Sequence, residues 1–213
     1  IDGDPGLGKS TAVLDYAARV STGAAMPDGS RGDLEGSQGV VILSAEDGLA
    51  DTIRPRLDAA GADCSRIVAL TAMRTATGDD RLVTLDDVAA IEAAIRQVGA
   101  RLVIVDPLMA YLPGAKNAHR DQDVRIVLSA LAKLAERTGC AIVVVRHLNK
   151  TVLTGNPLYR GGGSIGIIAA ARSGLLVGRD PEDETGARRI LVSTKCNLAI
   201  PPAALAYRLE STL

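Results

Sequence analysis

Aromatic residues are scarce in this chain: its 213 residues include no Phe, no Trp and only four Tyr. The hydrophobic core must therefore be aliphatic, built from Val, Ile, Leu and Ala. An excess of charge of either sign is also missing, because 24 Lys and Arg face 25 Asp and Glu, for a net charge of -1. No global basic field favours nucleic acid, so any such contact has to come from a local patch.

Cysteines and long apolar runs are scarce too. Cys64, Cys140 and Cys196 lie far apart and form no C-x-x-C motif, so the sequence indicates neither a disulfide framework nor a structural metal site. An odd, sparse set of cysteines favours a reducing compartment, and we expect the cytoplasm. The longest apolar runs, such as 102–105 and 141–145, are too short to cross a bilayer, so we expect no membrane partner.

The sequence does contain a glycine-rich motif near its start. It reads Gly3-Asp4-Pro5-Gly6-Leu7-Gly8-Lys9-Ser10, followed by Thr11, and fits the P-loop pattern G-x-x-x-x-G-K-[ST]. Glycines let backbone N–H groups approach phosphate oxygens, Lys9 would reach β- and γ-phosphates, and the Ser10 hydroxyl would bind Mg²⁺. The alternative is an ordinary glycine-rich turn before a helix, which the match at every fixed position disfavours. Only Ile1 and Asp2 precede Gly3, so we expect the strand that leads into the loop to be truncated.

Apolar periodicity predicts alternating strands and helices in a single domain, residues 1–213. Strands are expected at 39–44, 66–70, 101–106 and 140–146, and later at 172–177, 188–194 and 205–209. Helices are expected at 9–22, 49–60, 85–98 and 124–137, with a short helical or extended bridge at 165–171. This alternation predicts an α/β fold with a mostly parallel central sheet flanked by helices, and the late strands predict an antiparallel edge.

Polar residues follow three of these strands, at the edge where ligands bind in open parallel sheets. Asp106 comes after four apolar residues, as in a Walker B strand, and could hold Mg²⁺. Glu46 could polarise a water molecule that attacks a γ-phosphate, with Asp47 as the alternative, and His147 could contact that phosphate. Each also has a structural interpretation: an ordinary strand-end acid, a helix cap, which suits Asp47 better than Glu46, or a surface histidine.

Cations are concentrated in the second half of the chain. Residues 138–178 contain no Asp or Glu, and within this stretch Lys150, Tyr159 and Arg160 lie in a glycine-rich segment that could clasp single-stranded nucleic acid, with a base stacked on the tyrosine. An earlier loop carries further candidates for the same contact: Tyr111, Lys116, His119 and Arg120. Arg172 and Lys195, at strand ends, could reach a neighbouring subunit's nucleotide. The alternatives are subunit contacts for the loops and solvated strand ends for the two cations.

Several motifs follow the P-loop in a fixed order: Glu46-Asp47, a strand 102–106 followed by Pro107, a strand 143–147 followed by Asn149-Lys150, Arg160-Gly-Gly-Gly-Ser164, and Ala171-Arg172-Ser173. This set covers nearly the whole chain and resembles the RecA-like ATPases of the RepA type, which are plasmid hexameric replicative helicases, and their AAA-type bacterial relatives. The resemblance implies a RecA-like core that hydrolyses ATP with Mg²⁺, assembles as a ring, a hexamer in such helicases, and has single-stranded DNA as a partner.

The same resemblance assigns roles to individual residues. It implies that Lys9 and Ser10 bind the phosphates and Mg²⁺, that Glu46 is the catalytic carboxylate and that Asp106 is the Walker B acid. For three further residues it implies a γ-phosphate sensor, an arginine finger acting on the next subunit and a second trans-acting cation: His147, Arg172 and Lys195.

Two functions of different classes stay open. The first is a DNA-dependent ATPase motor, helicase-like, in the replication of a plasmid, phage or other mobile element. The second is an ATP-driven switch or assembly ATPase in the manner of KaiC or the recombinases, without unwinding activity. A GTPase is disfavoured because Asn149-Lys150-Thr151-Val152 lacks the Asp of an N-K-x-D base-reading motif. A small-molecule kinase is disfavoured because no arginine-rich substrate lid is evident.

Overall fold

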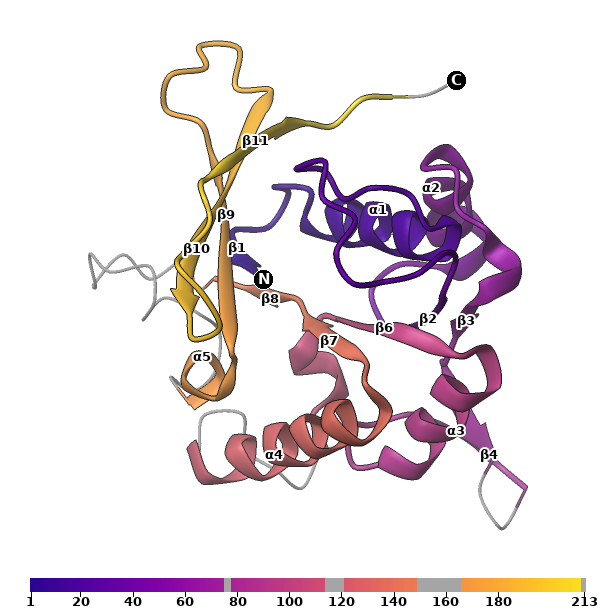
Figure 1. Ribbon diagram of the computed structural model, residues 1–213. Helices are drawn as coiled ribbons and strands as arrows, with labels where there is room; N and C mark the ends of the chain where they lie inside the picture. The colour runs from indigo at the N-terminus through magenta and orange to yellow at the C-terminus, as the bar shows by residue number, and fades with distance from the viewer. Residues whose placement is uncertain (75–77, 114–120, 149–165, 212–213) are drawn as a thin grey trace.

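The computed structural model describes residues 1–74, 78–113, 121–148 and 166–211. Parallel strands form its centre, as the sequence predicts (Figure 1). One sheet has the order β3-β2-β6-β7 and contains Ile67–Ala69, Gly39–Ser44, Ala100–Asp106 and Ala141–Val144. The other has the order β11-β10-β9-β1-β8 and contains Leu205–Arg208, Arg188–Cys196, Ser173–Arg179, Asp2–Gly3 and Arg146–His147.

The two sheets are continuous through one extended stretch of chain. Strands β7 and β8 are separated only by Val145, whose N–H donates to Val105 O at 2.9 Å. On the other side, the next residue, Arg146, donates its N–H to Ile1 O at 2.9 Å. The short strand β1 therefore pairs in parallel with both β8 and β9 and lies in the middle of the assembled sheet.

Helices cover both faces of this sheet. The described helices are α1 Lys9–Thr22, α2 Arg54–Ala59, α3 Val88–Val98, α4 Asp121–Thr138 and α5 Gly166–Ala170. Val41, Leu43 and Val105 pack toward α3 and α4, whereas their neighbours Val40 and Ile42 pack toward α1 and α2. Since successive strand residues point to opposite faces, a strand buried on both sides is apolar throughout, which explains the uninterrupted runs in the sequence.

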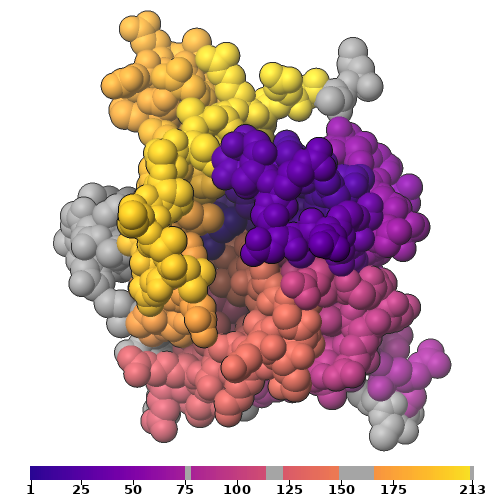
Figure 2. All heavy atoms as spheres, viewed as in Figure 1, coloured from indigo at the N-terminus to yellow at the C-terminus, as the bar shows by residue number. Residues whose placement is uncertain are grey.

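The late strands form the expected antiparallel edge. Strand β10 pairs antiparallel with both β9 and β11, with a register shift between Ser193 and Lys195. The C-terminal strand then crosses back to the N-terminal part of the chain, where a Cβ atom added to Gly8 would lie 2.3 Å from Leu209 Cδ1. Figure 2 shows the yellow C-terminal segment lying against the indigo N-terminal segment.

The structure differs from the sequence-based expectation in two segments. The helix expected at 49–60 begins instead as a π-helical turn, Leu49–Ile53, and becomes α-helical only from Arg54, with Pro55 in its first turn. The polar segment after β3 contains a small hairpin, β4 Ala72–Arg74 and β5 Asp80–Leu82. Short 3-10 turns, Cys64–Arg66 and Leu108–Tyr111, complete the described elements.

Candidate nucleotide-binding site

The P-loop connects the end of β1 to the start of α1. Gly6 and Gly8 have φ values of 76° and 80°, in the left-handed region that glycine adopts without strain. Gly8 is also the N-cap of α1, and in the described part of the chain no side chain caps this helix. The N–H groups of its first turn, together with the positive end of the helix dipole, are therefore suited to bind an anion.

Lys9 lies at the base of this loop and is only 3% exposed. Its Nζ donates hydrogen bonds to Gly3 O at 2.8 Å and to Asp4 O at 2.9 Å. Burial lowers the pKa of the Lys9 ammonium, and the nearby carboxylates, Asp106 first among them, partly offset this effect. The ammonium therefore lies inside the loop, bound to carbonyl oxygens that phosphate oxygens could replace as its partners.

Asp106 is the last residue of β6 and is 8% exposed. Burial raises the pKa of its carboxyl group, whereas a hydrogen bond with the Ser10 side chain acts in the opposite direction. The structure therefore brings together the hydroxyl and the carboxylate that the sequence predicts as Mg²⁺ ligands. These are hard oxygen donors beside a phosphate-binding loop, and this donor set fits Mg²⁺, which retains several waters and phosphate oxygens as its other ligands.

Glu46 and His147 meet beside this pair. Glu46 Oε2 and His147 Nε2 are 3.3 Å apart, and both side chains contribute to the electrostatic environment of Asp106. This proximity follows from the sheet, in which β2 lies beside β6, with Ser44 opposite Asp106, and β7 lies on the other side of β6. Within the described residues, the second ring nitrogen of His147, Nδ1, is buried and has no hydrogen-bond partner.

Asp47, the alternative to Glu46, has a different partner. Its Oδ2 accepts a hydrogen bond from Arg56 Nη1 of α2 at 2.7 Å. Glu46 has its side chain 61% exposed and is directed toward His147. The geometry therefore favours Glu46 as the carboxylate that faces the phosphate site.

The two remaining cations lie far from this cluster. Arg172 directly precedes β9, whereas the P-loop follows β1, whose Gly3 is opposite Val177 near the other end of β9. Lys195 pairs with Gly174 and donates its Nζ to the carbonyl oxygens of Ile168 and Ala169. Both cations are therefore at the edge of the sheet opposite the P-loop of the same chain, and Arg172 is exposed at its side of that edge.

Sequence reasoning missed a cavity next to the P-loop. A cavity of about 600 Å³ lies between α1, α2 and β11, and Thr11, Tyr16 and Tyr207 are among the residues that line it. Tyr207 Oη also approaches Leu7 O of the P-loop at 3.5 Å. Two of the four tyrosines in a chain without Phe or Trp thus line one cavity, and this scarcity of aromatic residues was the sequence signal that could have pointed to it.

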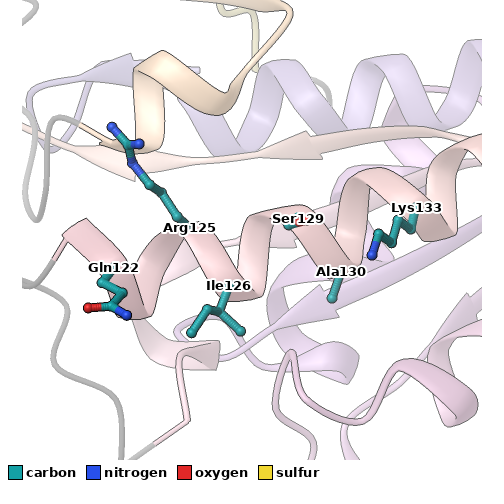
Figure 3. A pocket seen from close by; sticks show the side chains of 6 residues that line it. All are labelled: Gln122, Arg125, Ile126, Ser129, Ala130 and Lys133. Carbon is teal, nitrogen blue, oxygen red and sulfur yellow. The ribbon is translucent and has the colours of Figure 1, made fainter.

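A second hollow, of about 690 Å³, runs along the exposed side of α4 (Figure 3). All of its described lining residues come from that one helix: Gln122, Arg125, Ile126, Ser129, Ala130 and Lys133. The opposite side of α4 packs into the core through Val127, Leu131 and Leu134. The hollow includes none of the residues that the sequence analysis assigned to a site.

The predicted nucleic-acid contacts are mostly beyond the reach of the structure. Lys150, Tyr159 and Arg160 lie outside the described residues, as do Lys116, His119 and Arg120. Tyr111 is described and is only 4% exposed, so the expectation that it could stack on a base is wrong. Arg146 is buried as well, bound to Asp2, and does not contribute to a positive surface.

Two searches of the described residues gave negative results. In residues 1–74, 78–113, 121–148 and 166–211, no cluster of three or more His, Cys, Asp or Glu side chains has an arrangement that could hold a metal ion. Each helix in those same ranges is too short or too polar to span a bilayer.

Comparison with solved structures identifies a similar fold. A chain described as the ATPase domain of a helicase aligns with a TM-score of 0.66 and 16% sequence identity, covering 96% of this chain and 78% of that one. The match confirms the RecA-like α/β fold expected from the sequence. Comparison with curated proteins gave no match. Comparison with protein families matched residues 1–152 to AAA_25, described as "AAA domain". The chain therefore belongs to this family of ATPase domains.

Proposed function

We propose that this chain is a RecA-like motor domain that binds ATP and Mg²⁺ and hydrolyses the γ-phosphate bond. The observation that carries this proposal is the convergence of five side chains at the C-terminal ends of adjacent parallel strands and at the start of α1: Lys9, Ser10, Glu46, Asp106 and His147. Such a cluster contains a cation for phosphate, oxygen ligands for Mg²⁺ and a carboxylate near both, which are the groups that phosphoryl transfer requires.

In this proposal each residue has a distinct task. The P-loop amides and Lys9 bind the β- and γ-phosphates, and Ser10 and Asp106 hold Mg²⁺. Bound Mg²⁺ would neutralise charge on the phosphate oxygens. Glu46 orients the attacking water and accepts its proton. The hydrogen-bond distance between Glu46 and His147 supports a role for the histidine in keeping this carboxylate oriented and in contacting the γ-phosphate.

The cavity beside the P-loop offers a place for the base and ribose of ATP. It begins at Thr11, the residue after Ser10, and continues between α1 and β11. Tyr16 and Tyr207 supply the flat apolar surfaces on which a purine can pack. We propose that Tyr207 contacts the base, because its hydroxyl already reaches the P-loop backbone at Leu7.

The positions of Arg172 and Lys195 support assembly into a ring, which we propose to be a hexamer. Neither cation is near the P-loop of its own chain, and an arginine finger that is supplied in trans must lie on a surface that faces the next subunit. Single-stranded DNA is the proposed partner, with contacts from Lys150, Tyr159 and Arg160, and replication of a plasmid, phage or other mobile element is the proposed context. The cytoplasm is the proposed location.

One experiment separates a DNA motor from an ATP-driven switch. The rate of ATP hydrolysis is measured with and without single-stranded DNA, and the displacement of a labelled strand from a forked duplex is followed in parallel. The motor proposal expects a several-fold stimulation of hydrolysis by DNA together with strand displacement. Hydrolysis that is indifferent to DNA, with no displaced strand, would contradict the motor and favour the switch, and an absence of hydrolysis would contradict both.

A further inference from the structure

An ion pair is buried beneath the proposed active site. Arg146 Nε donates to Asp2 Oδ1 at 2.9 Å, and Arg146 Nη2 donates to Asp2 Oδ2 at 2.6 Å. Arg146 is 1% exposed and Asp2 is 7% exposed, so both charges are removed from water. A buried pair of this kind is often no more stabilising than well-packed apolar residues of the same volume, so stability alone does not account for its presence.

The pair lies at the point where two functional segments are joined. In the parallel pairing of β1 with β8, Asp2 is opposite Arg146 and Gly3 is opposite His147. Gly3 is the first residue of the P-loop, and His147 is the residue that reaches Glu46. This pairing involves only two residues of each strand, so few backbone hydrogen bonds are available to fix the position of His147 relative to the loop.

One backbone oxygen connects the same two segments. Gly3 O accepts a hydrogen bond from Lys9 Nζ at 2.8 Å and another from Leu148 N, directly after His147, at 3.2 Å. When the Lys9 ammonium turns toward a phosphate, its bond to Gly3 O is weakened. The bidentate geometry of the Asp2–Arg146 pair fixes both the distance and the orientation of the two strands, because a guanidinium and a carboxylate meet in one plane.

We propose that the buried Asp2–Arg146 pair is a positioning device that holds His147 in register with the P-loop, so that nucleotide binding at Lys9 changes the environment of His147. The coupling rests on the proposed function, whereas the positioning of His147 does not. Arg146 and Asp2 touch neither phosphate nor Glu46, and they act only through the strands that carry His147 and Gly3.

The test replaces both charges together. In Asp2→Leu/Arg146→Met the pair becomes apolar and leaves no uncompensated buried charge, so the chain is expected to fold. The matched control is Glu92→Gln/Arg137→Gln, which removes an ion pair between α3 and α4, away from the site. The readout is the imidazole NMR signal of His147, identified by its loss in His147→Gln, since the chain has only two histidines.

Two results are expected. Without nucleotide, the His147 signal of Asp2→Leu/Arg146→Met moves or broadens relative to wild type, and that of the control does not. With AMP-PNP and Mg²⁺, the signal shifts in wild type and in the control but loses most of this shift in the apolar double variant. An unmoved nucleotide-free signal in a folded double variant overturns the positioning inference, whatever the nucleotide does. Failure of AMP-PNP to bind wild type contradicts the proposed function, and the nucleotide-free comparison still decides the positioning.

Turnover gives a second test of the same inference. Asp2→Leu/Arg146→Met is expected to lower kcat for ATP at least tenfold with little change in KM, because the P-loop itself is retained. In a His147→Ala background the same double substitution is expected to lower kcat no further, since its effect passes through the histidine. Equal losses in both backgrounds would mean that the pair acts independently of His147 and would overturn the inference.

Discussion

Glu46 Oε2 lies 3.3 Å from His147 Nε2, although the two residues are 101 positions apart in the sequence. The contact exists because β2 and the β7–β8 stretch flank the same strand, β6, and end at the same edge of the sheet. A carboxylate, an imidazole and the Asp106 carboxylate are thereby gathered around the P-loop, and this grouping makes the role of each residue testable by substitution.

Replacing the proposed general base should separate binding from chemistry. We expect Glu46→Gln to bind ATP with a Kd within about threefold of wild type, while kcat falls by roughly 10²–10⁴, the usual contribution of a positioned acid or base. Fluorescent nucleotide titration and single-turnover hydrolysis measure the two effects.

Asp47→Asn is the matched control for this substitution. Because Arg56 already binds Asp47, we expect its kcat to stay within about threefold of wild type. A loss of turnover in Asp47→Asn that equals or exceeds that of Glu46→Gln would move the catalytic role to Asp47.

Mixing two inactive variants tests whether Arg172 acts on a neighbour. Lys9→Ala removes the phosphate cation and Arg172→Ala removes the proposed finger, so each variant alone should lose nearly all turnover. In an equal mixture, an intact P-loop meets an intact Arg172 at about one site in four if subunits assemble at random in a ring. We expect ATPase activity to recover toward that fraction. Activity that does not depend on mixing would argue against a site shared between subunits.

Asp106 illustrates a conflict between activity and stability. Burial raises the pKa of its carboxyl group above the unfolded value, so the folded state disfavours the charged form, and this penalty is fully present at neutral pH. We therefore expect Asp106→Asn to increase the Tm of the nucleotide-free chain at pH 7 while strongly reducing Mg²⁺-dependent hydrolysis. The gain in Tm should shrink as the pH falls toward the ordinary carboxyl pKa of about 4. Thermal melts of both chains across this pH range measure it, and a Tm at pH 7 that is equal or lower would contradict the prediction.

The cavity beside the P-loop can be tested with a ligand that lacks a base. If Tyr207 packs on adenine, Tyr207→Ala should weaken ATP binding by about 1–3 kcal/mol, a roughly 5- to 150-fold increase in Kd. Its affinity for tripolyphosphate should be unchanged, because the phosphates bind at Lys9 and the loop. Tyr207→Phe retains the ring and serves as the control. Calorimetric titration with both ligands gives the comparison, and equal losses for ATP and tripolyphosphate would mean that Tyr207 supports the loop rather than the base.

Glu92 predicts an acid-dependent contribution to stability. It bridges two helices by accepting hydrogen bonds from Arg137 and Arg96, which lower the pKa of its carboxyl group to about 2. A depressed carboxyl pKa adds stability that is fully present above the unfolded value of about 4.3 and is lost as pH falls toward 2. The urea midpoint of wild type should therefore exceed that of Glu92→Gln at pH 6, and the difference should disappear near pH 2.5. A difference that is independent of pH would contradict the prediction.

The parallel α/β fold could be predicted because buried strands carry a simple signal. The runs at 39–44 and 101–106 are apolar throughout, and the observed strands Gly39–Ser44 and Ala100–Asp106 agree with them to within one residue. The β4–β5 hairpin gave no such signal, since its residues are largely exposed and Leu82 is 76% exposed. A strand that buries little apolar surface leaves no periodic pattern to detect.

The electrostatic interpretation of the sequence was less successful, for a geometric reason. Residues 138–178 contain no acid, and this suggested a positive surface. In the fold, however, Arg146 is bound to Asp2 and the neighbouring Arg137 is bound to Glu92, both from earlier parts of the chain. Charge balance is set by neighbours in space. For the same reason the sequence did not reveal that Tyr16 and Tyr207 line one cavity.

The central position of β1 has a consequence for biosynthesis. Its two neighbours in the sheet are β8, at Arg146–His147, and β9, where Leu176 and Val177 pair with it. The strand that leads into the P-loop therefore finds neither partner until most of the chain has left the ribosome. Contacts so distant in sequence form slowly. Nascent chains should accordingly be unable to retain nucleotide until Val177 has emerged, so this domain acquires its ligand at the end of translation.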